Sequence, residues 1–181
     1  MQAKLIDFSI ASLLPKEAQE IKNPNSLEGT LAYISPEQTG RMNRGVEYRS
    51  DFYSLGVTFY ELLTGEIPFN SDDAMELVHC HIAKKPPTLK KLHLNSLLER
   101  KPHSNPLLEK KPHPSPLLGK EREKEIPRVI SDIVVKLMAK NAEDRYQSAL
   151  GLKYDLEKCL YQLKDSGSID NFEIAQRDIC D

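Results

Sequence analysis

The sequence lacks the features that mark membrane-spanning, disulfide-rich and zinc-binding proteins. Within its 181 residues no apolar run approaches the roughly 20 residues needed to span a bilayer, and the N-terminus has no basic region followed by an apolar segment. The three cysteines, Cys80, Cys159 and Cys180, are odd in number, far apart and without C-x-x-C spacing. These absences predict a cytoplasmic protein without membrane contact, disulfide framework or zinc site.

Charge is distributed unevenly along the chain. Hydrophobic residues make up 39% and charged residues 29%, which is ordinary for a globular protein, and the formal net charge is −2. Residues 84–125 nevertheless hold eleven Lys or Arg against five Glu, and a decapeptide repeats there, as L-L-E-R-K-P-H-S-N-P and then L-L-E-K-K-P-H-P-S-P. This period is too short for helical or propeller arrays, and its prolines forbid a continuous helix. We predict that residues 86–125 form a disordered, solvated, low-complexity insert and do not bind nucleic acid.

Residues 50–65 form the segment around which the remaining chain is expected to be organised. Their sequence, S-D-F-Y-S-L-G-V-T-F-Y-E-L-L-T-G, carries apolar residues at three- and four-residue steps, and these extend almost around the whole circumference of a helix. A helix of this kind belongs inside a domain. Asp51 is predicted to be its N-cap, and Gly65 is predicted to lie just past its C-terminus.

Three further segments show helical periodicity. The first begins at Asp72 and continues to Ile82, the second covers residues 126–138, and the third starts with Ser148 as its cap and continues to Leu163. His79 and His81 lie within the first of these. At a two-residue helical separation their side chains point about 200° apart, so we do not expect them to share a metal ion.

Several short motifs occur in a fixed order around these helices. They are K-L-I-D-F-S at 4–9, G-T-L-A-Y-I-S-P-E at 29–37, L-T-G-E-I-P-F at 63–69 and E-D-R-Y-Q-S-A at 143–149. Together they resemble the C-terminal lobe of a serine/threonine protein kinase. T-G-R-M-N-R at 39–44 and F-E-I-A-Q-R-D in the tail further resemble the kinases found in large bacterial multidomain proteins that combine kinase, ATPase-like and sensor modules.

The resemblance implies a mainly α-helical fold. Residues 1–164 would be a partial kinase domain that contains the F, G, H and I helices of the family, with two very short strands near the N-terminus. The insert at 86–125 would interrupt this domain between the G and H helices. Residues 165–181 would be a linker tail that ends without a further domain.

The resemblance also assigns roles to residues before the central helix. Asp7 matches the aspartate that binds magnesium, and Phe8 matches its packing partner. Ser9 replaces the family's glycine, which puts the conformational freedom of this loop in doubt but leaves the carboxylate in place. Gly29 and Thr30 match the pair that shapes the substrate pocket at the end of the activation segment, and a threonine there favours serine/threonine substrates.

Two distant residues are implied to form an ion pair. Glu37 matches a glutamate that the family buries against an arginine of a late helix, and Arg145 is that arginine by its sequence context. Asp51 would open the helix that lies between them in the chain. All three residues are structural in this interpretation.

Most of the groups that phosphoryl transfer requires have no match in these 181 residues. The sequence contains no glycine-rich G-x-G-x-x-G cover, no V-A-I-K lysine for the ATP phosphates and no H-R-D-x-x-x-x-N catalytic loop, so the catalytic base is missing and only Asp7 matches. ATP and magnesium serve the intact family, but we expect this chain to bind neither tightly.

Two functions remain open. The first is a fragment of a serine/threonine kinase that acts on a protein substrate and is inactive alone. The second is a non-catalytic binding or scaffold module in signalling, which holds protein partners with the surface of the G helix and the basic insert. The sequence favours the fragment, because a binding module is not expected to begin within a motif.

Overall fold

The computed structural model describes residues 31–42, 44–89 and 125–178. Within these ranges the chain forms helices and short 3-10 turns and no β-strand. The helices are α1 (Arg49–Thr64), α2 (Ala74–Ala83), α4 (Arg128–Leu137) and α5 (Ala149–Ser166), and the 3-10 turns are η2 (Leu31–Tyr33), η3 (Glu37–Thr39) and η4 (Ala142–Asp144). The predicted N-terminal strands lie outside the described residues.

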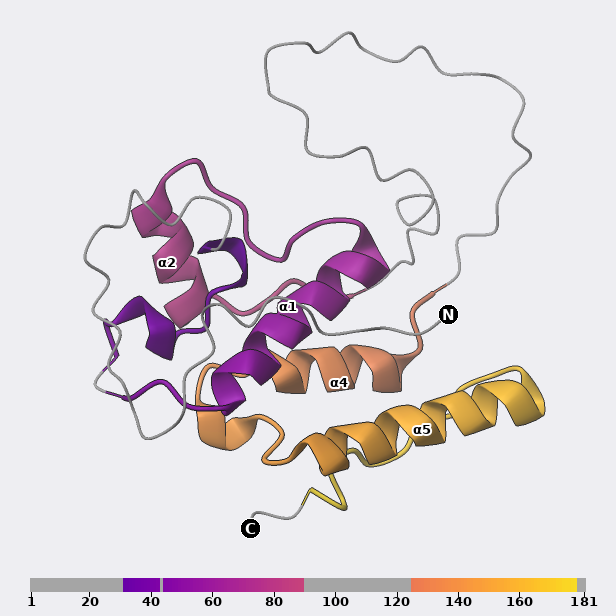
Figure 1. The fold of residues 1–181 in the computed structure, drawn as a ribbon. Coiled ribbons are helices and arrows are strands. Elements are labelled where there is room, and N and C mark those ends of the chain that lie inside the picture. The colour runs from indigo at the N-terminus through magenta and orange to yellow at the C-terminus, as the bar shows by residue number, and fades with distance from the viewer. Residues whose placement is uncertain (1–30, 43, 90–124, 179–181) are drawn as a thin grey trace, which may run out of the picture.

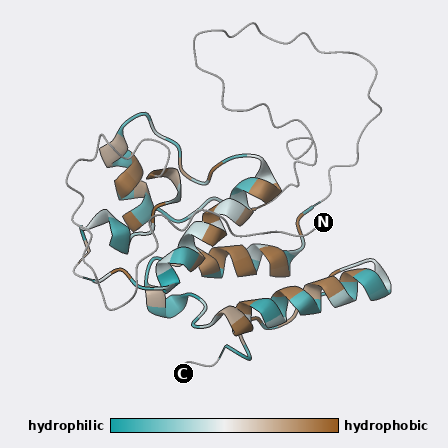
Figure 2. Ribbon diagram, viewed as in Figure 1, coloured by the Kyte–Doolittle hydropathy of each residue, from teal (hydrophilic) through white to brown (hydrophobic). Residues whose placement is uncertain are grey.

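Helix α1 occupies the middle of the structure, with α2 on one side and α4 on the other (Figure 1). Two groups of buried side chains surround it. The first group joins α1 to α2 and to the segment before α1, and it includes Tyr53, Val57, Phe69 and Val78. The second joins α4 to α5 and includes Ile133, Leu137, Tyr146, Leu152 and Cys159. Helix α4 contributes to both groups and is drawn largely in the hydrophobic colour in Figure 2.

The start of α1 differs from the prediction that Asp51 is its N-cap. The helix begins at Arg49, and Tyr48 occupies the cap position without a side-chain cap. The reason is that the backbone turns three residues earlier, where the amide of Ser50 donates to the carbonyl of Glu47 and that of Asp51 donates to the carbonyl of Tyr48. Asp51 therefore lies in the first turn. The end is as predicted, since Gly65 adopts a φ of 81° and its amide donates to the carbonyl of Glu61.

The other helix starts follow their capping residues. The carboxylate of Asp73 accepts from the amide of Met75 at 2.9 Å, so α2 is capped one residue later than the predicted Asp72. Ser148 caps α5 as predicted, because its Oγ accepts from the amide of Gly151 at 3.0 Å. None of the helices in the described ranges is long and apolar enough to cross a bilayer.

The packed part of the chain continues past two of the predicted boundaries. The insert was expected to start at residue 86, but Leu89 is buried in the first group, so the core extends to that point; residues 90–124 lie outside the described part. The linker was expected to start at 165, but α5 continues to Ser166. Residues 169–175 then pack against the second group through Ile169, Phe172, Ile174 and Ala175. The apolar side of α5 explains this, because the tail removes part of it from water.

The contact between α1 and α4 depends on the glycine at position 56. A Cβ atom on Gly56 would lie 2.8 Å from Leu137 Cβ and 2.8 Å from Met138 Cγ, closer than two packed carbon atoms approach. We predict that Gly56→Ala lowers the free energy of unfolding by about 1–3 kcal/mol, because the two helices must move apart.

Urea denaturation of the full chain would measure this change. Thr58→Ala is the matched control on the same helix, since the Thr58 hydroxyl donates to the Ser54 carbonyl within α1. A loss for Gly56→Ala no larger than that for the control would contradict the close contact.

Candidate functional site

The structure describes only part of the predicted site. Asp7, Phe8, Gly29 and Thr30 lie outside the described residues, so their assigned roles stay predictions. The structure does describe residues 31–42, which directly follow the predicted substrate pocket. The candidate site is therefore the set of contacts that fixes this segment to the helices.

Hydrogen bonds hold the first half of the segment on α1. The hydroxyl of Ser54 donates to the carbonyl of Tyr33 at 2.8 Å, and the hydroxyl of Tyr33 donates to Glu61 at 2.6 Å. Leu31 and Ile34 are buried in the first hydrophobic group. The segment is thus fixed by both polar and apolar contacts with α1.

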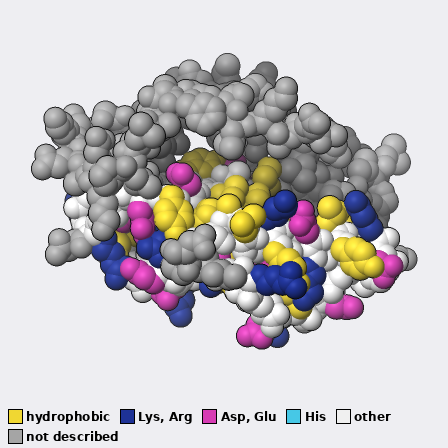
Figure 3. Space-filling view, turned by 60° about the horizontal axis from the view of Figure 1, so that its bottom comes forward, with side chains coloured by type: hydrophobic (Ala, Val, Ile, Leu, Met, Phe, Trp, Pro, Cys, Tyr) yellow, Lys and Arg dark blue, Asp and Glu magenta, His cyan; other side chains and the backbone are white. Residues whose placement is uncertain are grey.

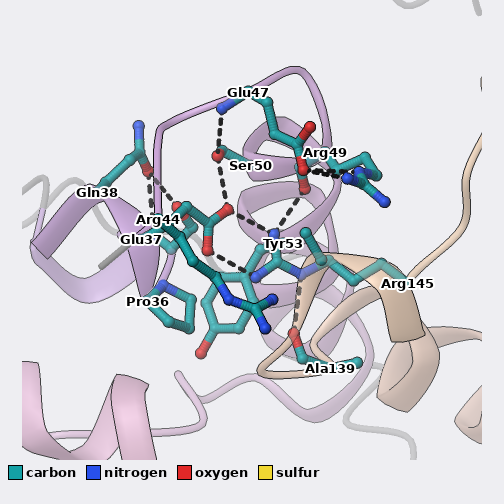
Figure 4. Close-up of polar contacts among 12 residues, drawn as sticks. Pro36, Glu37, Gln38, Arg44, Glu47, Arg49, Ser50, Tyr53, Ala139 and Arg145 are labelled. Carbon is teal, nitrogen blue, oxygen red and sulfur yellow. Dashed lines mark hydrogen bonds and ion pairs between the residues drawn. The ribbon is translucent and has the colours of Figure 1, made fainter. Parts of the chain in front are cut away.

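The second half is fixed by the ion pair predicted from the sequence, which is present. Arg145 Nη1 lies 2.6 Å from Glu37 Oε1, and Arg145 Nη2 lies 2.8 Å from Glu37 Oε2 (Figure 4). The two parallel bonds make this a bidentate pair. Ser50, in the first turn of α1, donates its hydroxyl to Glu37 Oε1 at 2.6 Å. The pair is enclosed, with Arg145 0% and Glu37 5% exposed.

The remaining donors of Arg145 bind backbone carbonyls. Nε donates to Ala139 at 2.8 Å, Nη1 donates also to Arg49 at 2.9 Å, and Nη2 donates also to Lys140 at 3.2 Å. The guanidinium lies over the ring of Tyr53, 5.1 Å from its centroid. A buried cation is tolerated only when its donors are satisfied and a counter-charge is near, and both conditions hold here.

A polar cavity of about 380 Å³ lies next to the ion pair. The charged side chains that line it are Glu37, Glu47, Glu143, Arg44, Arg49 and Lys140. Arg44 pairs with Glu143, Arg49 with Glu47, and Glu37 with Arg145. Lys140 instead donates hydrogen bonds to the hydroxyl of Tyr53 and to the carbonyls of Cys80 and His81. The ion pairs brace the segment that leads from η3 into α1.

A second buried polar cluster lies where α2 meets α1. Tyr53 and His81 share a hydrogen bond between Oη and Nδ1 at 3.0 Å, and both are 0% exposed. Lys140 Nζ donates to the hydroxyl of Tyr53 and to the carbonyls of Cys80 and His81, so it binds the last turn of α2. The sequence analysis missed this cluster, although helical spacing places His81 three residues after the buried Val78.

The two histidines of α2 differ in exposure. His81 is buried while His79 is exposed, as their spacing implies. Among the described residues no three His, Cys, Asp or Glu side chains come together in a way that could hold a metal ion.

Comparison with known proteins identifies the family. Residues 1–155 match the sequence profile described as "Protein kinase domain". The chain belongs to the protein kinase family. That match includes both ends of the ion pair and all of α1, α2 and α4.

Individual kinases show the same relationship. The chain is 45% identical over 134 residues to hybrid signal transduction histidine kinase G of Dictyostelium discoideum, covering 74% of this chain and 3% of that protein. It is 31% identical over 155 residues to a probable serine/threonine-protein kinase of Clostridium perfringens, covering 86% of this chain and 18% of the relative. The serine/threonine-protein kinase PknB of Mycolicibacterium smegmatis is 29% identical over 153 residues, or 84% and 19% of the two chains. The kinase chain thus spans less than a fifth of each of these relatives.

The ion pair of this kinase chain changes the pKa of its carboxylate. Burial alone raises the pKa of Glu37, but the hydrogen bonds from Arg145 and Ser50 and the charge of Arg145 outweigh it, so the pKa lies below the ordinary 4.5. The stabilisation from this group is therefore complete above pH 4.5 and is lost as the pH falls below that value.

We predict that Glu37→Gln lowers the free energy of unfolding by about 3–5 kcal/mol, because it leaves the buried Arg145 without a counter-charge. Urea denaturation at pH 7 measures the change. Glu143→Gln is the control, since it removes the carboxylate of the exposed Arg44–Glu143 pair and is expected to change stability little. Equal effects of the two substitutions would contradict the importance of the buried pair.

A second prediction concerns the pH dependence of stability, which the buried His81 is expected to influence. Burial and the nearby charge of Lys140 lower the pKa of His81 from 6.5 to about 4. As the pH falls, His81 therefore takes up a proton in the unfolded chain before it does so in the folded protein. The folded state loses stability between pH 6.5, the ordinary pKa, and about pH 4, the pKa in the folded protein. From pH 7.5 to pH 5 we expect this one group to account for a loss of about 2 kcal/mol in the free energy of unfolding.

Urea denaturation at both pH values compares the wild type with two variants. His81→Gln removes the titrating imidazole and should flatten the pH dependence, even though the substitution itself can lower stability at both pH values. His79→Gln, at the exposed histidine of the same helix, should leave the pH dependence as in the wild type. An unchanged slope in His81→Gln would show that His81 does not stay neutral in the folded state.

Proposed function

We propose that these residues form the part of a serine/threonine kinase catalytic domain that holds the activation segment and meets the protein substrate. The observation that carries the proposal is the buried, bidentate pair between Glu37 and Arg145, because it and the bond from Ser50 fix the segment after the proposed substrate pocket to α1 and to the loop that precedes α5. The names of the relatives from Clostridium and Mycolicibacterium support serine/threonine specificity. We propose a cytoplasmic location and a protein substrate on the same basis.

Gly29 and Thr30 supply the finer part of this proposal. Glu37 follows Thr30 by seven residues, so the buried ion pair lies close in the sequence to the residues assigned to the substrate pocket. A rigid support of this kind suits catalysis, since small errors in the position of a substrate hydroxyl cost large factors in rate. Asp7 is the proposed magnesium ligand.

The 181-residue polypeptide by itself is proposed to be inactive. Phosphoryl transfer depends on charge stabilisation and on a base within hydrogen-bond reach of the attacking hydroxyl. Of the groups that provide these in the family, the sequence matches only Asp7. A magnesium ion with one protein carboxylate keeps most of its water, so ATP and magnesium are expected to bind weakly here.

A non-catalytic binding module is the alternative. The observation that favours it is the outer face of α2, which exposes Met75, Glu76 and His79. An exposed methionine beside polar groups is typical of an adaptable protein contact. This face would serve either function, so an activity measurement must distinguish them.

We predict that the purified 181-residue chain transfers no detectable phosphate from labelled ATP to casein or to a basic protein, and that Asp7→Ala makes no difference. The second polypeptide for this experiment is PknB of M. smegmatis in which residues 1–178 of this chain replace the matching segment. The PknB part of this chimera is meant to supply the glycine-rich cover, the lysine for the ATP phosphates and the catalytic loop, which have no match in the 181 residues. We expect it to transfer phosphate, and we expect Asp7→Ala to abolish the transfer.

Circular dichroism and thermal unfolding establish that the chimera is folded, and unaltered PknB is the positive control. A folded chimera without activity would favour the binding module. Transfer by the 181-residue chain alone, lost in Asp7→Ala, would show that it assembles a catalytic site from residues that we regard as structural.

A further inference from the structure

The tail after α5 makes specific contacts that the proposed function does not use. It lies beyond residues 1–155, the part that matches the protein kinase domain. Ile169, Phe172 and Ile174 pack against the second hydrophobic group. Two cations cover rings at this contact, with Lys158 Nζ 4.0 Å from the centroid of Phe172 and Arg177 Cζ 4.4 Å from that of Tyr154. On the face that Figure 3 shows, basic side chains lie directly against hydrophobic ones.

The tail also ends in a charged contact with the start of α5. The carboxylate of Asp178 accepts hydrogen bonds from the amide of Gln147 at 2.7 Å and from the amide and hydroxyl of Ser148 at 2.8 and 3.0 Å. This close approach requires the glycine at position 151, since a Cβ there would lie 2.5 Å from Asp178 Oδ1. Asp178 therefore satisfies amides that precede the helix and would otherwise need another acceptor.

A second contact lies one turn further along α5. Asp155 Oδ2 accepts from the hydroxyl of Tyr146 at 2.6 Å and from the amide of Ala175 at 2.7 Å. Tyr146 is 0% and Asp155 1% exposed. Ala175 adopts a φ of 61°, which residues other than glycine rarely adopt, so these contacts hold the tail in one particular backbone conformation.

Residues 145–148 also contact the segment before α1, where the Glu37–Arg145 pair forms what we call the anchor of the proposed activation segment. Arg145 pairs with Glu37. Gln147 accepts from Arg49 Nη1 through its side chain at 2.5 Å and from the hydroxyl of Tyr48 through its carbonyl at 2.8 Å. Residues 145–148 are thus held between the anchor and the tail.

We propose that the tail is a strap that positions residues 145–148 and thereby stabilises the anchor of the activation segment. Asp178 is a positioning residue that acts through Gln147 and Ser148 on Arg145. Tail docking and anchoring of residues 31–39 then stabilise one another by the same factor, because such coupling is reciprocal. The linkage does not depend on whether the 181 residues transfer phosphate.

Amide hydrogen exchange of the full chain, followed by mass spectrometry of peptides, tests the coupling. In Asp178→Asn the new NH2 group faces N–H or O–H donors of Gln147 and Ser148, which previously donated hydrogen bonds to the carboxylate. We expect exchange in residues 31–42 to accelerate at least about fivefold, while exchange in α2 stays as in the wild type. Asp170→Asn is the matched control, at an exposed tail residue whose side chain has no hydrogen bond among the described contacts.

Gly151→Ala is a second variant that separates the strap from general stability. Alanine favours the helix more than glycine does, but its Cβ displaces Asp178. Faster exchange in residues 31–42 of this variant would support the coupling, since a purely local role of the glycine predicts slower exchange in α5 and no change in residues 31–42.

The reverse direction uses Ser50→Ala, which removes the hydroxyl that donates to Glu37, with Thr58→Ala as control on the same helix. We expect exchange of residues 169–178 to accelerate in Ser50→Ala only. Acceleration confined to residues 145–178 in the tail variants, or equal acceleration in α2 and every other region, would overturn the proposal.

Discussion

The structure depends most on one buried positive charge. Arg145 is fully enclosed, and its donors are divided among the carboxylate of Glu37 and the carbonyls of Arg49, Ala139 and Lys140. Since an unpaired buried cation costs several kcal/mol, the chain is stable only when these acceptors converge. The requirement brings together η3, the start of α1 and the loop after α4, and Glu37 and Arg145 lie 108 positions apart in the sequence.

The same charge limits what its neighbours can do. Lys140 also lies in this region, with Nζ 5.5 Å from the centroid of the Tyr53 ring that Arg145 covers. Burial is the largest cause that lowers the pKa of Lys140, to about 8, and Arg145 lowers it further, while Cys80 opposes the shift. Burial, and then the charge of Lys140, lower the pKa of His81, so this histidine is held neutral and shares one hydrogen bond with Tyr53. The polar groups around α1 therefore form one electrostatic unit.

The sequence predicts those parts of the structure that a local motif or a local periodicity indicates, and not the contacts between distant residues outside such motifs. Glu37 and Arg145 were identifiable because each stands in a motif whose context specifies its partner, and the helices were identifiable from their periodicity. The cap of α1 was not, because the backbone hydrogen bonds of Ser50 to Glu47 and of Asp51 to Tyr48 start the turn before Asp51, and these form only in the folded structure. The docked tail was not, because the steps from Ile169 to Phe172 and from Phe172 to Ile174 are three and two residues, so they follow no single helical or strand period, and Asp178 has its partners 30 and 31 positions away.

These constraints bear on how one lobe can serve more than one function. The acceptors of Arg145 lie in the helices and loops described above, and none of them is a residue that the sequence assigns to nucleotide or magnesium binding. The arrangement is compatible with both proposed functions, because the same support for residues 31–39 would serve to orient a substrate for transfer or to hold a partner without it.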